Sequence, residues 1–468
     1  MTRPGPQEDV ERALQAARGG DCVVIAEESS AANLRWAGNT LTTNGVSRAR
    51  RLTVIALRGG PGGTSTGIVS RTGVPSGEIP ALVAEAERAA TSAPPAPDAQ
   101  PLAGAGQAGP RAAGPGWDDP AASTGPAVFS AFASELGDAF DAAGAAGRRL
   151  YGFAEHSMTS VFLGNSAGLR LRHDQPSGKA ELNAKSADLS RSAWAGAATR
   201  DFADVAVADL HARLATELDW AARKVALPPG RYETLLSPSA VADLYIFLYW
   251  AAGAKDALDG RTVFSRPGGG TRVGEQLTSV PLTLRGDPGA AGLQCAPFMI
   301  AHSSDREMSV FDNGLALHPT EWISGGRLSA LVQTRYSAGL SGLAVTPAVD
   351  NLIMEVPGGS QSVAGLVAGT RRGLLVSCLW YIREVDPQTL LLTGLTRDGV
   401  YLVENGEVTG AVHNFRFNES PVKMLARITG AGASVPALPR ECSDDFVRAA
   451  MPPLRIDGFN MSSVSQAS

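Results

Sequence analysis

The chain has 468 residues, with 41 Lys and Arg against 46 Asp and Glu and a formal net charge of −5. At about 100–200 residues per domain, this length predicts two or three domains with a sizeable buried core. The mildly acidic balance argues against a nucleic-acid binder, because such a protein needs a basic face to contact phosphates.

The start of the chain and its cysteines indicate the compartment. The first residues lack the apolar stretch of a signal peptide. The most apolar segment, residues 241–254, contains Asp243 and is too short to span a bilayer. The four cysteines lie far apart and form no CxxC pair, which is typical of a reducing compartment. We therefore expect a cytoplasmic protein that binds no membrane.

Apolar periodicity predicts a mixed α/β beginning. Helical spacing of apolar residues predicts one helix over 10–17 and another over 79–86. Short apolar or alternating runs predict strands over 22–26 and 52–57. Asn44-Gly45, between these strands, predicts a turn.

Residues 91–127 differ sharply in composition from their surroundings. They hold eight of the 30 prolines and six glycines, mixed with Ala, Ser and Gln. Such a segment buries too little apolar area to offset its ordering entropy, so we expect a flexible linker or an insertion. Residues 104–109 match GxGxxG, but no strand precedes and no helix follows them. We interpret this match as a chance feature of low complexity.

Regular structure is predicted to resume at Phe129. Apolar residues spaced three and four apart over 129–140 predict a helix, and strands over 160–163 and 169–173 flank a glycine-containing turn. The clearest helical pattern runs over 207–225, and the Pro-Pro-Gly sequence that begins at Pro228 ends it.

After residue 228 the pattern becomes mainly β. Runs over 400–403 and 408–412 flank Asn405-Gly406, which is the strongest short hairpin signal because Asn-Gly suits a type I′ turn. One apolar helix is predicted over 239–253. Further strands are predicted over 327–335, 373–380 and 389–392.

We therefore predict an α+β fold with two domains. A mixed α/β N-terminal domain comprises residues 1–90 and 128–228, and the linker or insertion at 91–127 separates its two parts. A predominantly antiparallel β C-terminal domain comprises residues 229–468.

The histidines form no local metal motif. A helix-borne zinc site needs two histidines one turn apart and a Glu to activate water. The two closest of the six histidines, His302 and His318, are sixteen residues apart. A site assembled from distant loops, for instance His302 or His318 with Cys295, stays open. Isolated surface or hydrogen-bonded histidines are the simpler interpretation.

Two GxSxG matches, at 63–67 and 164–168, raise the question of serine chemistry. A nucleophile elbow needs a strand before the serine and a helix after it, and neither match has that context. We interpret both as turns of small residues. Residues 59–63 are rich in glycine but lack the lysine of a phosphate-binding loop. Local motifs thus reveal no self-sufficient catalytic centre.

A colinear series of short motifs runs through the second domain. The motifs are Phe311-Asp-Asn-Gly314, Gly325-Gly-Arg-Leu328, Thr334-Arg-Tyr-Ser-Ala338, Pro357-Gly-Gly359, Gly373-Leu-Leu-Val376, Val403-Glu-Asn-Gly-Glu407 and Phe415. Their order and spacing resemble the TldD/PmbA family, whose members form a two-subunit metalloprotease. Asn33-Leu-Arg35, the residues around Asn165 and Gly168, and the long helix before Arg231 fit the same resemblance. It covers most of the chain except 91–127.

The resemblance implies which chemistry to expect just after the domain boundary. There, the TldD-type subunit carries an HExxxH helix that holds zinc together with a cysteine. This chain has residues 235–248 at that place, with no His and with Asp243 as the only acid. We therefore expect a TldE (PmbA)-type subunit with no catalytic residue, metal ligand or cofactor of its own, and zinc in the partner. We also expect Ser237 to cap the helix and Cys378 to be a buried core thiol rather than a ligand.

The resemblance further implies a structural role. The family's subunits enclose a shared cavity, where a peptide lies extended and binds mainly through its backbone. We expect a TldD-type zinc-bearing partner and an unfolded peptide substrate. Arg335 and Tyr336 are candidate cavity or interface residues, with a solvated Arg beside a core Tyr as the alternative. A stand-alone modulator or binding protein of this fold, and a divergent metallopeptidase with dispersed ligands, stay open as other functions.

Overall fold

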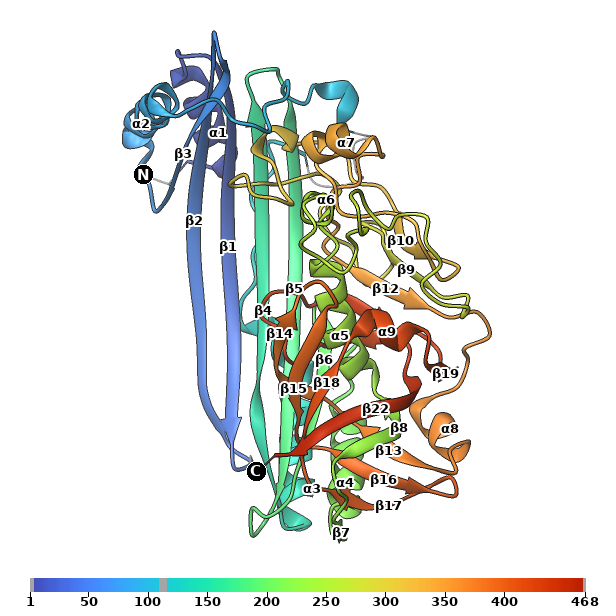
Figure 1. Ribbon diagram of the computed structural model, residues 1–468. Coiled ribbons are helices and arrows are strands. Elements are labelled where there is room, and N and C mark those ends of the chain that lie inside the picture. Colours follow the sequence, from blue (N-terminus) through green and yellow to red (C-terminus); the bar gives the residue numbers. More distant parts are fainter. Residues whose placement is uncertain (1–3, 109–115, 466–468) are drawn as a thin grey trace.

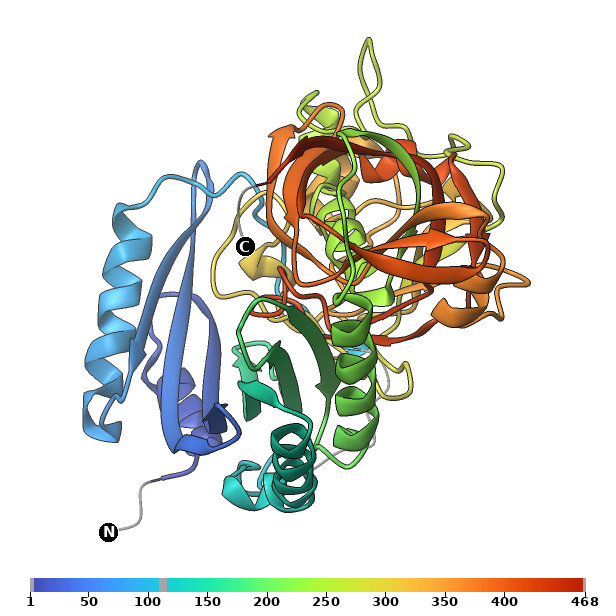
Figure 2. The ribbon, with the colours of Figure 1, turned by 90° about the horizontal axis from the view of Figure 1, so that it is seen from below.

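The computed structural model describes residues 4–108 and 116–465. The chain has the predicted α+β fold with two domains. A long N-terminal sheet stands beside the C-terminal domain in Figure 1, and Figure 2 shows from below how the sheet curves along that domain.

The N-terminal domain is built on one antiparallel sheet in the order β3-β2-β1-β4-β5-β6. Its strands are β1 (Asp21–Ala37), β2 (Leu41–Gly60), β3 (Gly63–Thr72), β4 (Arg148–Asn165), β5 (Arg170–Ser186) and β6 (Ser192–Thr199). Helices α1 (Pro6–Ala16) and α2 (Ile79–Ser92) cover its upper end in Figure 1, and α3 (Ser130–Ala145) and α4 (Val207–Trp220) cover its lower end. The helices predicted over 10–17, 79–86 and 129–140 are confirmed.

Side-chain alternation along β1 explains how the upper end of the sheet is packed. Val24 and Ala26 pack with α1 and α2 on one face. Val23 and Ile25 pack on the other face against a C-terminal loop that includes Phe311. Because both faces are buried, the sequence here reads as a continuous apolar run, as the predicted strand over 22–26 indicated.

Two sheets build the C-terminal domain. The larger has the order β14-β15-β18-β22-β8-β13-β16-β17-β7, with β19 paired to β22. Its strands are β7 (Lys224–Val225), β8 (Gly230–Leu236), β13 (Arg372–Val376), β14 (Leu379–Asp386), β15 (Leu391–Thr396), β16 (Val400–Glu404), β17 (Glu407–Val412), β18 (Phe415–Glu419), β19 (Ile428–Ala431) and β22 (Leu454–Val464). The smaller sheet, in the order β11-β10-β9-β12-β21-β20, contains β9 (Thr283–Gly286), β10 (Thr320–Ser324), β11 (Arg327–Leu328), β12 (Leu352–Glu355), β20 (Val435–Ala437) and β21 (Ala449–Met451).

Helix α5 (Pro238–Trp250) lies inside the C-terminal domain and contacts strands of both sheets. Leu244, Tyr245 and Ile246 are fully buried, as expected for a helix that is apolar on all sides. Short helices complete the domain: α6 (Ala254–Leu258), α7 (Arg335–Ser341), α8 (Val363–Ala368) and α9 (Pro421–Leu425). The predicted Asn-Gly hairpin is confirmed by β16 and β17, with both Asn405 and Gly406 at positive φ.

Two predictions in the N-terminal domain differ from the structure. Asn44 and Gly45 lie inside β2, paired with β1, and the chain reverses at residues 38–40, where Asn39 has φ 66°. In a strand that is exposed to solvent, small polar residues are as compatible with the extended conformation as with a turn. The long helix ends at Trp220 instead of continuing to residue 225, because Lys224 and Val225 pair with β17.

Two strand predictions in the C-terminal domain were also inaccurate. Of the predicted strand over 327–335, residues 327–328 form a strand and residues 332–333 form only isolated β-bridges. Helix α7 begins at Arg335, where Thr334 accepts a hydrogen bond from the Ser337 N–H at 3.1 Å. The predicted strand over 373–380 is two strands, β13 and β14, separated at Ser377 and Cys378.

The segment expected to be a flexible linker or insertion, 91–127, is hydrogen-bonded to the rest of the protein in both parts that the structure describes, 91–108 and 116–127. Residues 93–108 show this best. The Ala96 N–H donates to the Thr64 carbonyl (2.8 Å), Ser309 donates to Asp98 (2.7 Å), and Asn165 donates to the carbonyl of the fully buried Ala103 (2.8 Å). The segment thus joins the sheet to the C-terminal domain. Its GxGxxG match ends at a glycine outside the described residues. Among residues 4–108 and 116–465, no helix has the length and hydrophobicity needed to cross a membrane.

Candidate functional site

Helix α5 occupies the place where a zinc helix was sought. Ser237 is its N-cap, as predicted: its Oγ accepts from the Ala240 N–H at 3.2 Å and donates to the Ser377 carbonyl at 2.5 Å. The next hydroxyl, on Ser239, donates to the Leu438 carbonyl at 2.7 Å. The polar groups of the first turn therefore hold the surrounding backbone in place.

Asp243, the one acid on α5, also has a structural role. Its carboxylate accepts three backbone N–H groups, from Arg440 (3.1 Å), Glu441 (3.0 Å) and Cys442 (3.2 Å). Burial raises the pKa of Asp243 to about 8, against these three donors, which lower it. The carboxylate fixes the start of the loop formed by residues 438–448, called here the clamp loop.

The dispersed donors do not come together in the described part of the chain. No group of three or more His, Cys, Asp and Glu side chains that could hold a metal occurs within residues 4–108 and 116–465. His302 lies 3.0 Å from the Thr53 hydroxyl and 3.1 Å from Glu27, on the N-terminal sheet, while His318 is exposed. Cys295 is buried, and burial raises its pKa to about 12.

Both GxSxG matches have structural roles. Ser65 lies in β3, and Ser166 lies in the turn between β4 and β5. Ser166 donates to Asp21 (3.0 Å) and accepts from the Cys22 N–H (3.1 Å), so its hydroxyl closes the turn against β1. Neither serine lies between a strand and a helix.

A groove of about 480 Å³ lies between the lower half of the N-terminal sheet and the clamp loop. In the lower half of β1, Leu34 and Trp36 are buried against α3, whereas Ala31 and Asn33 line the groove. The neighbouring strands continue this face in register, since Ala31 lies opposite Ser157 on β4. We call this groove the sheet groove. Its sheet side is lined by Ala31, Asn33, Glu155, Ser157, Ser177 and Lys179, among others.

Most charges of the sheet groove are paired within the protein. Lys179 donates to Asp444 at 2.5 Å, and Arg448 donates to Ser177 at 2.6 Å and pairs with Asp350. His156 is held between the Thr124 hydroxyl (2.7 Å) and the Arg200 carbonyl (2.6 Å). A lining of hydroxyl, amide and paired charged groups can hydrogen-bond an extended chain. Its described serines, Ser157, Ser177 and Ser443, bond to a backbone carbonyl, Arg448 and Lys179 rather than to a general base.

The clamp loop is fastened to the sheet by Arg440. The guanidinium lies between the rings of Trp194 (5.1 Å) and Trp380 (4.9 Å). It donates to Asp398 at 2.8 Å and contacts the Cys378 sulfur at 2.9 Å. Cys378 is fully buried, as predicted, and burial raises its pKa to about 12. Because Trp194 belongs to β6 and the others to the C-terminal domain, this cluster joins the domains.

The two candidate residues on α7 lie away from the sheet groove. Arg335 donates to Asp312 (2.7 Å) and to the Pro101 carbonyl (2.9 Å), so it anchors α7 and the 93–108 segment rather than being solvated. Asp312 is almost fully buried. Tyr336 is half-buried.

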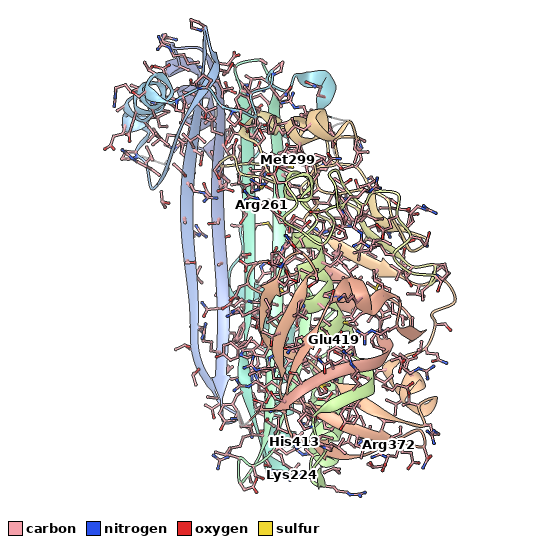
Figure 3. The ribbon with its side chains drawn as sticks, viewed as in Figure 1. Lys224, Arg261, Met299, Arg372, His413 and Glu419 are labelled. Carbon is pink, nitrogen blue, oxygen red and sulfur yellow. The ribbon has the colours of Figure 1, made fainter. Side chains whose placement is uncertain are left out.

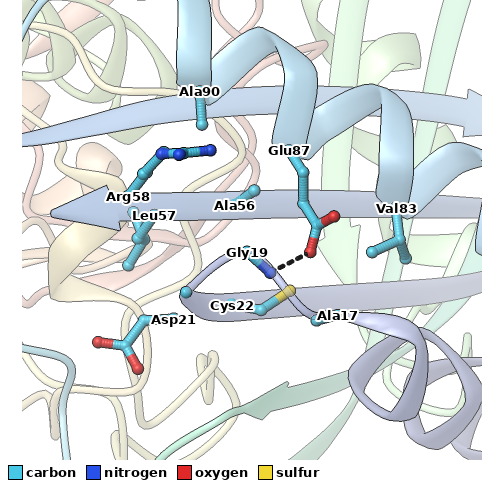
Figure 4. Close-up of a pocket in the computed structure, with 11 residues that line it drawn as sticks. Ala17, Gly19, Asp21, Cys22, Ala56, Leu57, Arg58, Val83, Glu87 and Ala90 are labelled. Carbon is cyan, nitrogen blue, oxygen red and sulfur yellow. Dashed lines mark hydrogen bonds between the residues drawn. The ribbon is translucent and has the colours of Figure 1, made fainter.

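A second hollow, beside Cys22 and Glu87, is too small to be a site. Figure 4 shows Glu87 reaching the Gly19 N–H, at 2.7 Å, beneath α2. The volume of this hollow is about 10 Å³, which is near the space that one water molecule needs. Glu87 here closes the turn between α1 and β1.

Comparison with protein families identifies the second domain. Residues 229–463 match the PmbA/TldA metallopeptidase C-terminal domain. The chain belongs to the PmbA/TldD family. Comparison with curated proteins finds no significant match.

Solved structures extend the PmbA/TldD likeness of the fold to nearly the whole chain. TldE from Thermococcus kodakarensis superposes with a TM-score of 0.77 at 15% identity, over 97% of this chain and 99% of that one. A candidate modulator of DNA gyrase from Thermotoga maritima gives 0.76 at 16% identity, with 97% and 99% covered. One from Bacteroides thetaiotaomicron gives 0.72 at 16% identity, with 98% of each chain covered.

For a PmbA/TldD protein, the sheet groove is the feature that our sequence reasoning missed. A short signal was present, because apolar and polar residues alternate from Ala32 to Trp36. This pattern predicts a strand with one buried and one exposed face. The residues that lie across the groove from the exposed face are in the clamp loop, more than 400 positions later in the sequence.

Proposed function

We propose that this chain is a non-catalytic, TldE-type subunit of a cytoplasmic heteromeric metallopeptidase that degrades or processes unfolded peptides. A TldD-type partner would supply the zinc and the catalytic base, and this chain would supply a wall of the shared chamber. Membership of the PmbA/TldD family is the starting point of the proposal.

The single observation that carries it is the chemistry of α5. Where the family resemblance implies an HExxxH motif, the chain has Ser237 to Ala242, followed by Asp243. Ser237 and Asp243 both bond to neighbouring backbone, so neither is free to hold a metal or to activate water.

The sheet groove supports a peptide-facing role. Its small hydroxyl and amide side chains suit a bound backbone whose side chains vary, because they satisfy main-chain groups without selecting residues. The exposed apolar residues after Tyr336 support a partner surface at α7: Leu340 is 53% exposed, and Leu343 and Val345 are also exposed.

Reconstitution tests the proposal. The chain, a TldD-type partner and the co-expressed pair would each be assayed with an unfolded peptide, and zinc would be measured in each. We expect cleavage by the pair with stoichiometric zinc only in the partner. Stoichiometric zinc in the isolated chain, together with chelator-sensitive cleavage, contradicts the non-catalytic assignment.

A paired substitution tests the α7 surface. Leu340→Asp should weaken co-purification of the two subunits at least tenfold, because it places a charge in an apolar contact. Leu189→Asp is the matched control, because Leu189 is also 53% exposed but lies on the N-terminal domain. Equal effects of the two variants would indicate that the interface does not lie at α7.

The stand-alone modulator remains the second candidate. It is favoured by the names of the Thermotoga and Bacteroides proteins, each described as a candidate modulator of DNA gyrase. Failure of this chain to associate with any TldD-type partner, with retained fold, would favour it.

A further inference from the structure

A second junction between the domains holds a larger and chemically different pocket. It has a volume of about 640 Å³ and lies between α4 of the N-terminal domain and α8, β13 and β17 of the C-terminal domain. In Figure 3 this is the lower end of the molecule, where Lys224, Arg372 and His413 are labelled. The volume falls within the roughly 300–1,000 Å³ typical of small-ligand pockets, which often lie at domain junctions. We call it the α4–α8 pocket.

Its walls are apolar and come from rigid elements. The apolar lining consists of Trp220, Pro238, Val363, Ala364, Val367, Leu375 and Val408. Trp220 packs edge-on against the buried ring of Tyr401, with ring centroids 5.2 Å apart. The indole wall is therefore held in position without a ligand.

One buried carboxylate stands among these walls. Glu217, on the same face of α4 as Trp220, is only 4% exposed and lines the pocket. Its Oε1 accepts from Arg213 at 2.9 Å, and its Oε2 is buried without a hydrogen-bond partner in the described structure. Burial raises the pKa of Glu217, while Arg213 and the nearby Ser377 hydroxyl lower it. An acceptor with no partner at hydrogen-bond distance favours an incoming donor.

The charges around the pocket favour a cation. Of the described residues that line the pocket, only Arg213 is positively charged, and its side chain is 41% exposed. Glu217 and Glu407 carry negative charges, so the lining has a net charge of 1 − 2 = −1. An apolar cavity with one net negative charge complements an apolar molecule with one positive charge.

We propose that the α4–α8 pocket binds a small amphiphilic amine, an apolar body with a single primary ammonium group. The body fills the space between Trp220, Val367 and Val408. The ammonium donates to the Glu217 carboxylate on the side that Arg213 leaves free. This inference goes beyond the proposed peptidase role and does not depend on it.

Three probes of one shape test the charge preference. 3-Phenylpropylamine, 3-phenylpropanol and 3-phenylpropanoate would be titrated into the full chain by calorimetry. We expect the amine to bind at least tenfold more tightly than the alcohol and the carboxylate to bind weakest. Equal affinity of amine and carboxylate, or no binding of the amine up to about 10 mM, overturns the proposal.

Two variants locate the binding. Glu217→Gln should lower amine affinity about tenfold and leave alcohol affinity within twofold, because it keeps the shape and removes the charge. Val408→Trp should abolish binding of both by filling the cavity, and it serves as the second test if Glu217→Gln does not fold. Glu155→Gln, in the sheet groove, is the matched control. An amine affinity unchanged by both pocket variants excludes this site.

Discussion

The two junctions between the domains differ in how they use charge. In the sheet groove, Lys179 and Arg448 are committed to Asp444, Ser177 and Asp350, so the polar lining is nearly satisfied by the protein itself. In the α4–α8 pocket, apolar walls surround Glu217, which has one unsatisfied oxygen. The first junction suits a ligand held by many weak, unselective hydrogen bonds, and the second suits a ligand selected by one buried charge.

The largest expected effect comes from releasing the clamp loop that closes the sheet groove. Arg440→Ala should lower the free energy of unfolding by about 3 kcal/mol, because it removes the 2.8 Å ion pair of Asp398, which keeps only the longer contact with Arg397, and the contact with both tryptophans. Urea denaturation measures this. Arg383→Ala, whose ion pair with Glu441 involves a side chain that is 67% exposed, should cost less than about 1 kcal/mol. An equal loss of stability in both variants would mean that Arg440 does not fasten the clamp loop.

The second prediction concerns the other anchor of the clamp loop, Asp243. Its folded pKa is raised to about 8, whereas an unfolded Asp titrates near 3.9. Between these two pKa values the native state keeps a proton on Asp243 that the unfolded state has lost. The stability that Asp243 contributes is therefore complete below about pH 4 and is lost as pH rises toward 8. Relative to the Asp243→Asn variant, the free energy of unfolding of the wild type should fall by up to about 1.4 kcal/mol per pH unit between pH 4 and pH 8.

Denaturation of both proteins from pH 4 to pH 9 measures that difference. Asp445→Asn is the control, because this neighbouring carboxylate is exposed. A wild type and an Asp243→Asn variant with parallel profiles would show that the three N–H donors keep Asp243 ionised throughout.

A third substitution would fill the sheet groove and leave the clamp loop unchanged. Ser157→Trp puts an indole among the small side chains of β4 and should reduce peptide cleavage by the reconstituted pair about tenfold, with unchanged co-purification of the subunits. Lys185→Trp, on β5 outside the groove lining, is the control. Full activity of the Ser157→Trp pair would remove the groove from the peptide path.

Local patterns predicted the fold well where a segment is stabilised by its own periodicity. The helix over 79–86, the Asn405-Gly406 hairpin and the Ser237 cap all follow from neighbours within a few residues. The turn expected at Asn44 failed because pairing with β1, which no local signal encodes, extends the strand.

The candidate sites were less predictable for the same reason. Arg440 is placed by Trp194, Cys378, Trp380 and Asp398, and Glu217 lies beside Val408 only because α4 packs on β17. Residues separated by up to 246 positions cannot be paired from one sequence. Composition also misjudged 93–108, since alanines such as Ala103 fit where larger side chains do not.

The smallest expected effect distinguishes a rim charge from a buried one in the α4–α8 pocket. Glu407→Gln should weaken amine binding only about two- to threefold, against about tenfold for Glu217→Gln, because Glu407 is exposed and water screens it. The Glu407 contribution should also disappear when salt is raised from about 0.05 to 1 M, whereas that of Glu217 should persist. If both contributions vanish together in salt, the ammonium stays at the rim, and the buried oxygen of Glu217 is not its partner.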